Sequence, residues 1–399
     1  GLAADYPDLA DQLRRTTDRA FRNIIDLAVK EKVDAVIIAG DIYDGADKSL
    51  QAQLKFRDEL ARLSQAGIPS FIVHGNHDPL NSWSATLEWP EGVKVFPGDR
   101  VERVPLVKNG IVLAQIYGIS FPVQEVKENL ALRFAKESGP GFSIAVLHAN
   151  VGGNANHINY SPCTEDDLVS RDMDYWALGH VHAHQVIRPD RPAIVYPGNS
   201  QGRNPREQGV KGCCLVTLSE NAPADIRFIP TDVARYLSTT LDVSDCASVD
   251  GIIQSTQSRC ESISSGINGR GVVIRMTLTG RTPLHETLQR GNSLQAIEEA
   301  IQTDFSGRDP WIWLELKLQT AGIYDLDELR QGSDFVADLI HLYDEMEGET
   351  KFDEIRGTLE PLFKDWNGSG DLENLTDKEL QELLIQARDQ TLDRLVERD

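Results

Sequence analysis

The stretch VDAVIIAGDIYD, residues 33–44, joins a short, largely apolar run to a glycine-aspartate pair directly behind it. The run Val33–Ala39 is too short for a typical helix and is rich in β-branched residues, which predicts a buried strand. The stretch IPSFIVHGNHD, residues 68–78, repeats this arrangement. Helical periodicity over about residues 8–30 and 49–65 precedes each run. The pattern therefore predicts strand–helix–strand units around a partly parallel sheet.

More strands follow along the chain, with few long helices between them, which predicts two sheets rather than one doubly wound sheet. They are expected at residues 111–119, 143–147, 175–178, 193–196 and 213–218. We therefore expect residues 1–231 to form an α/β sandwich of two mixed β-sheets flanked by helices. Residues 232–325 predict a smaller α+β domain. Its expected elements are a helix near 248–260, a Ser/Gly-rich break at 262–271, a strand at 272–278 and a helix near 293–303.

The last part of the chain, residues 326–399, is expected to be helical and acidic. Of the formal net charge of −22, 19 acidic and 7 basic side chains fall within residues 331–399. A capping box formed by Thr376 and Glu379 predicts the start of a final helix. An acidic balance disfavours nucleic-acid binding, which depends on Lys and Arg. Residues 186–211 have the opposite balance, with five basic and two acidic side chains.

Cysteine usage and hydropathy restrict the class of protein and its compartment. The five cysteines include no C-x-x-C pair, which disfavours both a disulfide scaffold and a structural zinc site and favours a reducing cytoplasm. No apolar run approaches the roughly 18 residues of a membrane span. No signal-peptide pattern opens the sequence. We expect a cytoplasmic protein that does not interact with a membrane.

Four polar motifs stand where predicted strands end. They are Gly40–Asp44, Gly75–Asp78, His148 and Gly179–His182. Loops beyond the carboxyl ends of strands are where α/β proteins bind ligands, so these motifs are expected to converge. Each motif alone fits a simpler origin, since Gly-Asp is common in turns and a single histidine is often a core residue. Four in succession, each ending a strand, indicate a shared site.

The side chains of these motifs form a set of metal ligands without sulfur. The set offers one carboxylate, one amide oxygen and three imidazoles, from Asp41, Asn76, His148, His180 and His182. Such mixed oxygen and nitrogen ligands suit Mn, Fe or Zn, and disfavour a calcium cage or a thiolate zinc site. Two metals a few ångströms apart can share a carboxylate and hold a hydroxide for in-line attack on phosphorus.

Together, the motifs GDIYD, GNHD, H and GHVH resemble those of the calcineurin-like metallophosphoesterase superfamily. The GDIYD form resembles the branch of bacterial DNA-repair exonucleases related to the SbcD nuclease subunit. Two further stretches are similar to that branch, Tyr196–Asn199 (YPGN) and Thr279–His285 (TGRTPLH). The motif match covers roughly residues 33–200, and a less specific similarity extends to about residue 325.

The resemblance implies a role for each motif residue. Asp41 would bridge two divalent metals, with manganese the first choice and iron, zinc or magnesium the alternatives. Asn76, His148 and His180 would complete the shell of one metal, and His182 would bind the other. His77 would face the phosphate as a catalytic residue, with Asp78 as its orienting partner. Weaker candidates for substrate binding are Asp44, His157, Tyr160, Arg188 and Arg203. The flanking His74 and His184 are expected to have structural or second-shell roles.

One part of the family pattern is not found in this sequence. The family opens with an Asp-x-His on its first strand, which supplies two ligands of the first metal, and no Asp-x-His precedes residue 41 here. The alternatives are a shortened chain or misplaced start codon, residues left out of the sequence, or a degenerate site. With only Asp41 and His182 as ligands, we expect the first metal to bind weakly.

The sequence leaves three possible functions. The first is a metal-dependent phosphodiesterase that acts on DNA, an exonuclease or endonuclease of DNA repair, with residues 232–325 as a DNA-binding cap. The second keeps the metals but takes a small phosphodiester or nucleotide, which the acidic balance favours. The third is a catalytically impaired interaction subunit. The resemblance also implies an SMC-like coiled-coil ATPase bound by the C-terminal helices, and a homodimer.

Overall fold

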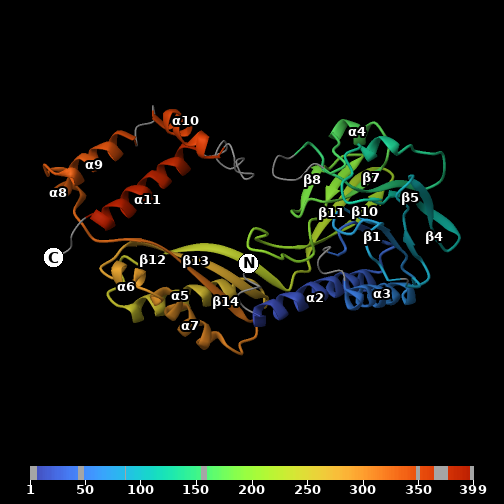
Figure 1. Ribbon diagram of the computed structural model, residues 1–399. Helices are drawn as coiled ribbons and strands as arrows, with labels where there is room; N and C mark the ends of the chain where they lie inside the picture. Colours follow the sequence, from blue (N-terminus) through green and yellow to red (C-terminus); the bar gives the residue numbers. More distant parts are fainter. Residues whose placement is uncertain are drawn as a thin grey trace. The chain divides into compact units, whose positions relative to one another are not determined.

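The computed structural model describes residues 7–43, 49–85, 87–153, 160–346, 351–363 and 376–395. The chain divides into two compact units, residues 1–236 and 237–399 (Figure 1). Among the helices of the described ranges, none combines the length and the hydrophobicity needed to span a bilayer.

The first unit contains a small parallel sheet in the order β1-β2-β3. Its strands are β1 (Val36–Ala39), β2 (Ser70–Val73) and β3 (Val93–Val95). β1 begins three residues later than the sequence predicts. Lys32 adopts a left-handed φ of 53° and the Val33 amide still donates to the Ala28 carbonyl, so these residues end the preceding helix. Pairing with β2 begins only at Val36.

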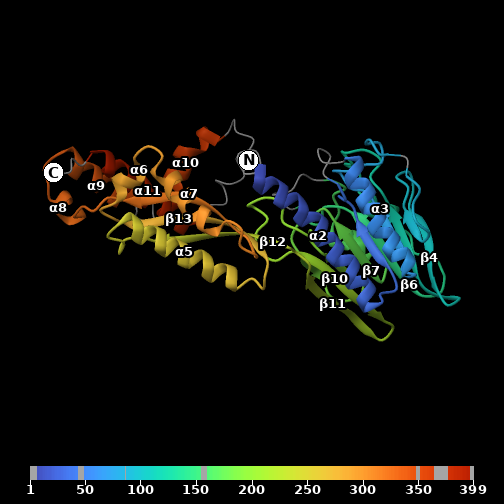
Figure 2. The same cartoon turned by 90° about the horizontal axis from the view of Figure 1, so that it is seen from below.

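Two helices, α2 (Pro7–Glu31) and α3 (Leu50–Gln65), lie side by side (Figure 2). Both pack on this sheet. Ser49 caps α3, because its side chain accepts a hydrogen bond from the Ala52 amide at 3.2 Å. The apolar faces of the two helices share one buried cluster with the sheet, made up of Ile25, Ala28, Phe56, Leu60, Leu63, Ile68 and Ile72. The predicted helices at 8–30 and 49–65 are therefore confirmed.

A larger mixed sheet follows in the order β4-β5-β6-β7-β9-β8. The strands are β4 (Glu102–Lys108), β5 (Ile111–Ile119), β6 (Phe142–His148), β7 (Tyr175–Gly179), β8 (Gln185–Arg188) and β9 (Ala193–Tyr196). The central strands β5, β6, β7 and β9 run parallel, whereas β4 and β8 pair antiparallel at the edges. The sequence predicted the four central strands and missed both edges, whose residues are mostly exposed or half-buried and form no apolar run.

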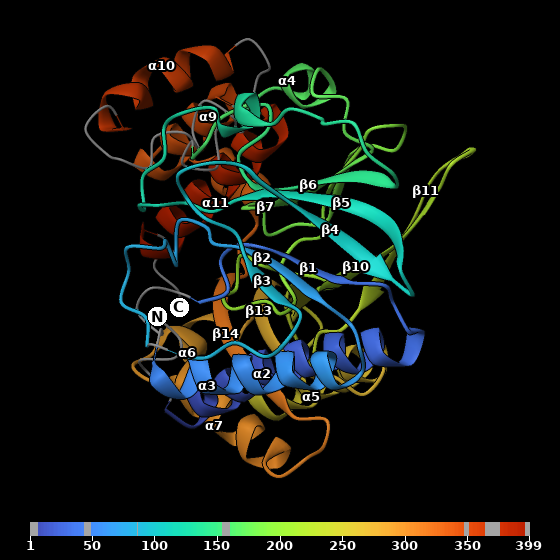
Figure 3. The same ribbon diagram turned by 90° about the vertical axis from the view of Figure 1, so that its right-hand side faces the viewer.

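The two sheets face each other across a shared core (Figure 3). That core contains Phe71 and Val73 of β2, Ile116 of β5, Val146 of β6, and Phe96. On the opposite face of the larger sheet, Trp176 of β7 belongs to a second buried cluster. Residues of the short helices η2 (Leu130–Arg133) and α4 (Glu165–Val169) belong to the same cluster. This arrangement confirms the predicted α/β sandwich of two sheets. Among the described strands, the larger sheet is mixed as predicted, whereas the small sheet is parallel. A hairpin of β10 (Gly212–Ser219) and β11 (Ala222–Pro230) completes the unit.

The second unit has a three-stranded sheet in the order β12-β13-β14 (Figure 1). Its elements are β12 (Ala234–Asp242), α5 (Val249–Ser265), β13 (Gly271–Arg281), α6 (His285–Gln289), α7 (Ser293–Phe305) and β14 (Ile312–Ala321). Alternate residues of β13 and β14 pack against α5 and α7 in one apolar core. The break expected at 262–271 is too long, because α5 continues through Ser265 and buries Ser264.

The last helices are α8 (Leu326–Arg330), α9 (Phe335–Met346), α10 (Phe352–Phe363) and α11 (Asp377–Leu395). The capping box predicted for α11 is confirmed. The Thr376 amide donates to the Glu379 carboxylate at 2.8 Å, and the Glu379 amide donates to the Thr376 hydroxyl at 3.3 Å. These helices belong to the same compact unit as the sheet. A boundary between domains 232–325 and 326–399 stays a prediction, as does the one at residue 231.

Helix α11 is fixed to the sheet by two carboxylates four residues apart. Arg281 donates to Asp389 at 2.7 Å and stacks on the Tyr324 ring, and His285 lies 3.1 Å from Asp393. The Gly322 amide also donates to Asp393, at 2.9 Å. Both basic partners come from the stretch Thr279–His285, which thus serves the docking of α11. The leucines of α11 are only partly buried. Leu380 and Leu392 are buried, whereas Leu383 and Leu395 are exposed.

We predict that the double substitution D389A/D393A releases α11 from the sheet. Removing the acidic partners leaves Arg281 and the buried His285 uncompensated, at a cost of about 3 kcal/mol, which raises the equilibrium constant for opening roughly 100-fold. Hydrogen–deuterium exchange over residues 377–395 measures this opening. E382A is the matched control, since Glu382 lies on the same helix and pairs with the exposed Lys378, at 3.9 Å. Equal exchange in all three proteins would show that the acidic pair does not hold the helix.

Candidate metal centre

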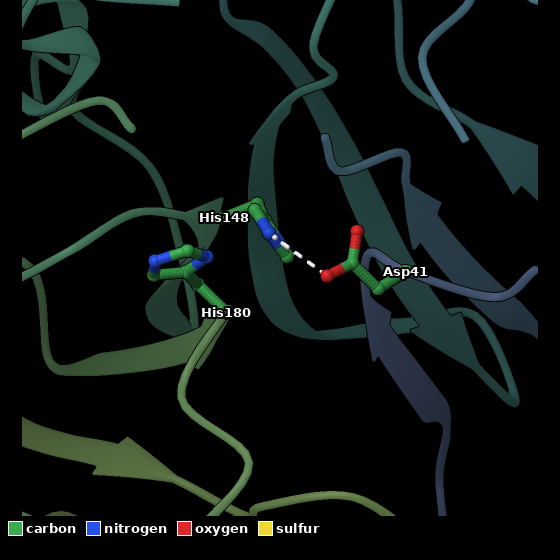
Figure 4. Close-up of side chains that lie close together, drawn as sticks. All are labelled: Asp41, His148 and His180. Atoms are coloured by element: carbon green, nitrogen blue, oxygen red, sulfur yellow. Dashed lines mark ion pairs between the residues drawn. The ribbon is translucent and has the colours of Figure 1, made fainter. Parts of the chain in front are cut away.

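Asp41, His148 and His180 lie together at the carboxyl ends of strands from both sheets. Asp41 follows β1 of the small sheet, whereas His148 ends β6 and His180 follows β7 of the large sheet. One ligand atom from each residue lies within 4.8 Å of the others (Figure 4). Three of the five predicted metal ligands therefore meet at one point. Asn76 joins them, because its Oδ1 lies 2.9 Å from His148 Nε2.

The buried His148 ring contacts a backbone carbonyl with one nitrogen and the other ligands with the second. Its Nδ1 lies 2.9 Å from the carbonyl oxygen of Ala39, the last residue of β1. A carbonyl oxygen only accepts hydrogen bonds, so Nδ1 carries the proton and Nε2 faces the site. There Nε2 lies 2.9 Å from Asn76 Oδ1 and 3.3 Å from Asp41 Oδ2. The ring thus links the two sheets. Its Nδ1 donates to Ala39 of the small sheet, and the lone pair of Nε2 points toward Asn76 and Asp41.

The arrangement of these atoms fits a divalent metal. His148 Nε2, Asn76 Oδ1 and Asp41 Oδ2 all present lone pairs to one small volume, where only a proton on Nε2 or a cation offsets their repulsion. The group contains carboxylate and amide oxygens and imidazole nitrogens but no sulfur, a set that suits Mn, Fe or Zn. The donor set therefore agrees with the prediction of divalent metals.

Glycines bring the backbone close enough for these contacts. A Cβ at Gly75 would lie 2.4 Å from Asp41 Oδ1, and one at Gly179 would lie 1.7 Å from the Ala39 carbonyl oxygen. Neither position has room for a larger residue. Asp41 and His180 themselves adopt positive φ values of 52° and 102°, which are unfavourable for residues with a side chain. Backbone strain of this kind is concentrated at functional sites.

His77 and Asp78 follow Asn76 directly but differ in environment. The His77 side chain is exposed, and its backbone amide donates to Asp41 Oδ1 at 3.0 Å, which fixes the carboxylate. The fully buried Asp78 accepts hydrogen bonds from the Gly75 amide at 2.8 Å and the Ile42 amide at 3.0 Å, and lies 3.1 Å from His74 Nδ1. Asp78 thus joins the Gly40–Asp41 and Gly75–Asp78 loops. Its role as an orienting partner of His77 stays a prediction.

The pKa of the Asp78 carboxyl is lowered although burial alone would raise it. The hydrogen bond and charge of His74, together with the Gly75 and Ile42 amides, outweigh the loss of solvent and favour the ionised form. His74 therefore supports the loop through Asp78, in agreement with the structural role expected for it. His184, the other flanking histidine, stacks on Phe228 at 4.6 Å between ring centroids.

His182 lies beside the cluster rather than within it. Its Nδ1 is 2.8 Å from Glu207 Oε1, and this hydrogen bond raises the pKa of the imidazole above its ordinary value against the opposing effect of burial. Sequence reasoning missed Glu207, which it counted only as an acidic residue within the basic segment 186–211. A single carboxylate 25 positions away gives no signal in the sequence that it contacts a histidine.

The structure places the weaker substrate candidates differently. Tyr160 is buried, with its ring edge-on to His180 at 5.8 Å between centroids. Arg188 contacts Glu165 at 3.3 Å, so its charge is partly offset. Arg203 is exposed. It lies near His182, because its backbone amide donates to Glu207, which contacts the His182 ring. Asp44 and His157 lie outside the described residues.

Comparison with known proteins agrees with this fold. A model of the calcineurin-like phosphoesterase family matches residues 10–184. The chain belongs to this family, whose members hydrolyse phosphoesters with divalent metals. A second model, the middle domain of the metallophosphoesterase YhaO, matches residues 236–321. The chain is 33% identical over 341 residues to the uncharacterized metallophosphoesterase YhaO of Bacillus subtilis (strain 168), which covers 84% of this chain and 83% of that protein.

The chain is also homologous to nucleases of the Mre11 type. It is 29% identical over 242 residues to the DNA double-strand break repair protein Mre11 of Sulfurisphaera tokodaii, covering 56% of this chain and 59% of that protein. It is 32% identical over 226 residues to the protein of the same name from Aeropyrum pernix, covering 51% and 53%. The resemblance to the DNA-repair branch, predicted from the motifs, is thereby confirmed.

We predict that D78A destabilises the first unit without removing a metal ligand. The substitution leaves two amides and His74 without their acceptor, which should lower the free energy of unfolding by about 3 kcal/mol at neutral pH. Urea unfolding of the metal-free protein measures the change, and D99A, at an exposed carboxylate, should cost less than about 0.5 kcal/mol.

The effect of D78A should also depend on pH. The pKa of Asp78 is lowered from 3.8, so its carboxylate stabilises the fold above that pH, and the stabilisation is lost as pH falls through the lowered pKa. The difference between wild type and D78A should therefore shrink in acid. A difference that grows in acid would contradict this assignment.

Proposed function

We propose that this protein is a metal-dependent phosphodiesterase that cleaves DNA, with manganese as the preferred metal. The observation that carries the proposal is the convergence of Asp41, Asn76, His148 and His180 at strand ends of both sheets. Bound cations would polarise the phosphoryl oxygens and lower the pKa of a water molecule, which supports in-line attack at phosphorus. In this proposal Asp41 serves two metals, Asn76, His148 and His180 hold one of them, and His182 holds the other.

The surroundings of His77 support a role for its side chain toward the substrate. Its backbone amide fixes the Asp41 carboxylate at 3.0 Å, so the residue is anchored beside the ligands, and its side chain is exposed. We propose that this imidazole donates a hydrogen bond to the phosphoryl oxygen or a proton to the leaving oxygen. An anchored backbone with an exposed side chain suits this role, because the ring can reach a substrate that arrives from solvent.

DNA is proposed as the substrate from two lines of support. The relatives in the Mre11 group are named as DNA double-strand break repair proteins. In this chain, Arg203 is exposed on the segment that carries Glu207, where it can meet a phosphate backbone. A DNA-binding role for the domain at 232–325 belongs to the same proposal, as does a cytoplasmic location, which the cysteines without disulfides support.

Partner binding is a further part of the proposal. Helices α9 and α11 expose Phe335, Leu342 and Leu383, and we propose these helices as the surface for a coiled-coil ATPase of the SMC type. A homodimer is proposed from the family resemblance alone. The alternative substrate, a small phosphodiester, is favoured by one observation, the net charge of −22, which opposes binding of a polyanion.

The two substrates are separated by parallel assays with Mn²⁺. We expect cleavage of labelled duplex or single-stranded DNA, together with hydrolysis of bis(4-nitrophenyl) phosphate, and loss of both activities in H148A or in excess chelator. H341A is the matched control, since His341 is an exposed histidine on α9, and should behave as wild type. Hydrolysis of the chromogenic ester without DNA cleavage would favour the small-substrate alternative. Absence of both activities would favour an interaction subunit.

We predict that H77A lowers kcat by about 100-fold, the contribution typical of one acid–base residue. Mn²⁺ affinity should change little, because the His77 amide, which contacts Asp41, remains in the variant. Steady-state kinetics together with calorimetric Mn²⁺ titration distinguish the two effects. A loss of Mn²⁺ binding that matches the loss of kcat would mean that His77 supports the metals instead of the substrate.

A further inference from the structure

We propose that Glu207 is a positioning residue that holds the His182 ring in the orientation for metal binding. This inference rests on the proposed role of His182 as a ligand. It adds Glu207, which belongs to none of the four motifs. The contact is direct, with Glu207 Oε1 2.8 Å from His182 Nδ1. A carboxylate offers only lone pairs, so Nδ1 is the donor and Nε2 is left to bind the metal.

The same proton position occurs at His148, reached by a different partner. There the Ala39 carbonyl accepts from Nδ1 at 2.9 Å, so Nε2 faces Asn76 and Asp41. The two histidines differ in packing, since the His148 side chain is 0% exposed whereas that of His182 is 45% exposed. Packing therefore fixes His148, but a ring as open as His182 requires a polar partner to restrict its rotation.

Glu207 is itself held tightly enough to serve as that partner. Its side chain is 12% exposed, and Oε2 accepts from the Asn199 side chain and from the Arg203 amide, each at 2.8 Å. One carboxylate oxygen is thus used by its own loop, and the other remains for His182. A surface glutamate in a simple ion pair would lack these two additional donors.

The backbone of His182 is fixed by the same segment. The Lys211 ammonium donates to the His182 carbonyl at 3.1 Å, and the Asn199 amide donates to it at 3.2 Å. Asn199 therefore contacts both His182 and Glu207, which gives the stretch Tyr196–Asn199 a physical role. Residues 199–211 restrain His182 at its backbone and at its ring, and Glu207 is the only described carboxylate that takes part.

The test compares E207A and E207Q with wild type, using two measurements that do not depend on catalysis. Nitrogen-15 NMR of the metal-free protein reports which His182 nitrogen carries the proton. Calorimetric titration with Mn²⁺ reports binding, and the H182A variant defines the part of that binding that depends on His182. E165A is the matched control, because Glu165 is a half-exposed acid that pairs with Arg188 in the same unit.

We expect E207A to lose the fixed Nδ1–H form and to weaken the His182-dependent Mn²⁺ binding by about 10- to 100-fold. E207Q keeps an oxygen acceptor and should retain the proton position with a smaller loss of affinity, and E165A should match wild type. Unchanged Mn²⁺ binding in E207A would overturn the proposal. It would equally be overturned if H182A left Mn²⁺ binding intact, and DNA cleavage by the wild type tests the proposed function separately.

Discussion

The hydrogen bond from His148 Nδ1 to the Ala39 carbonyl is the contact on which the site depends, because it joins the two sheets at their carboxyl ends. His148 ends β6 of the large sheet, and Ala39 ends β1 of the small sheet. With its proton committed to Ala39, the ring directs its lone pair at Asn76 and Asp41. The geometry of the metal centre is therefore set by how the two sheets pack. The apolar core between the sheets thus helps to position the metal ligands.

That packing places a steric condition on the loops. The backbone at Gly75 and Gly179 must pass so close to Asp41 and Ala39 that a single methyl group would collide. Asp41 and His180 adopt positive φ, a conformation that costs about 1–3 kcal/mol at such residues and persists only when the surroundings enforce it. The buried Asp78 supplies part of that enforcement through three hydrogen bonds to the loops. The fold thus holds the ligands in place before any metal arrives.

The sequence predicts the parts of this structure that depend on local pattern. Short apolar runs gave the central strands, and the polar residues directly after them gave Asp41, Asn76, His148 and His180. Contacts set by tertiary structure left no such signal. Glu207 reaches His182 across 25 positions. Val33 looked like the start of a strand although the helix before it continues to bond at that residue. Where a residue acts through a distant partner, spacing along the chain carries no information about the contact.

The net charge of −22 is an incomplete guide to what this surface binds, because some carboxylates are buried or paired inside the fold. Asp78 is buried among donors, and Asp389 and Asp393 on α11 are matched by Arg281 and His285. Glu207 faces His182 and its own loop. A carboxylate that is paired and desolvated contributes little to the potential that an approaching polyanion meets, compared with an exposed one. The charge that opposes DNA is therefore smaller at the metal centre than the composition suggests, and bound divalent cations would reduce it further.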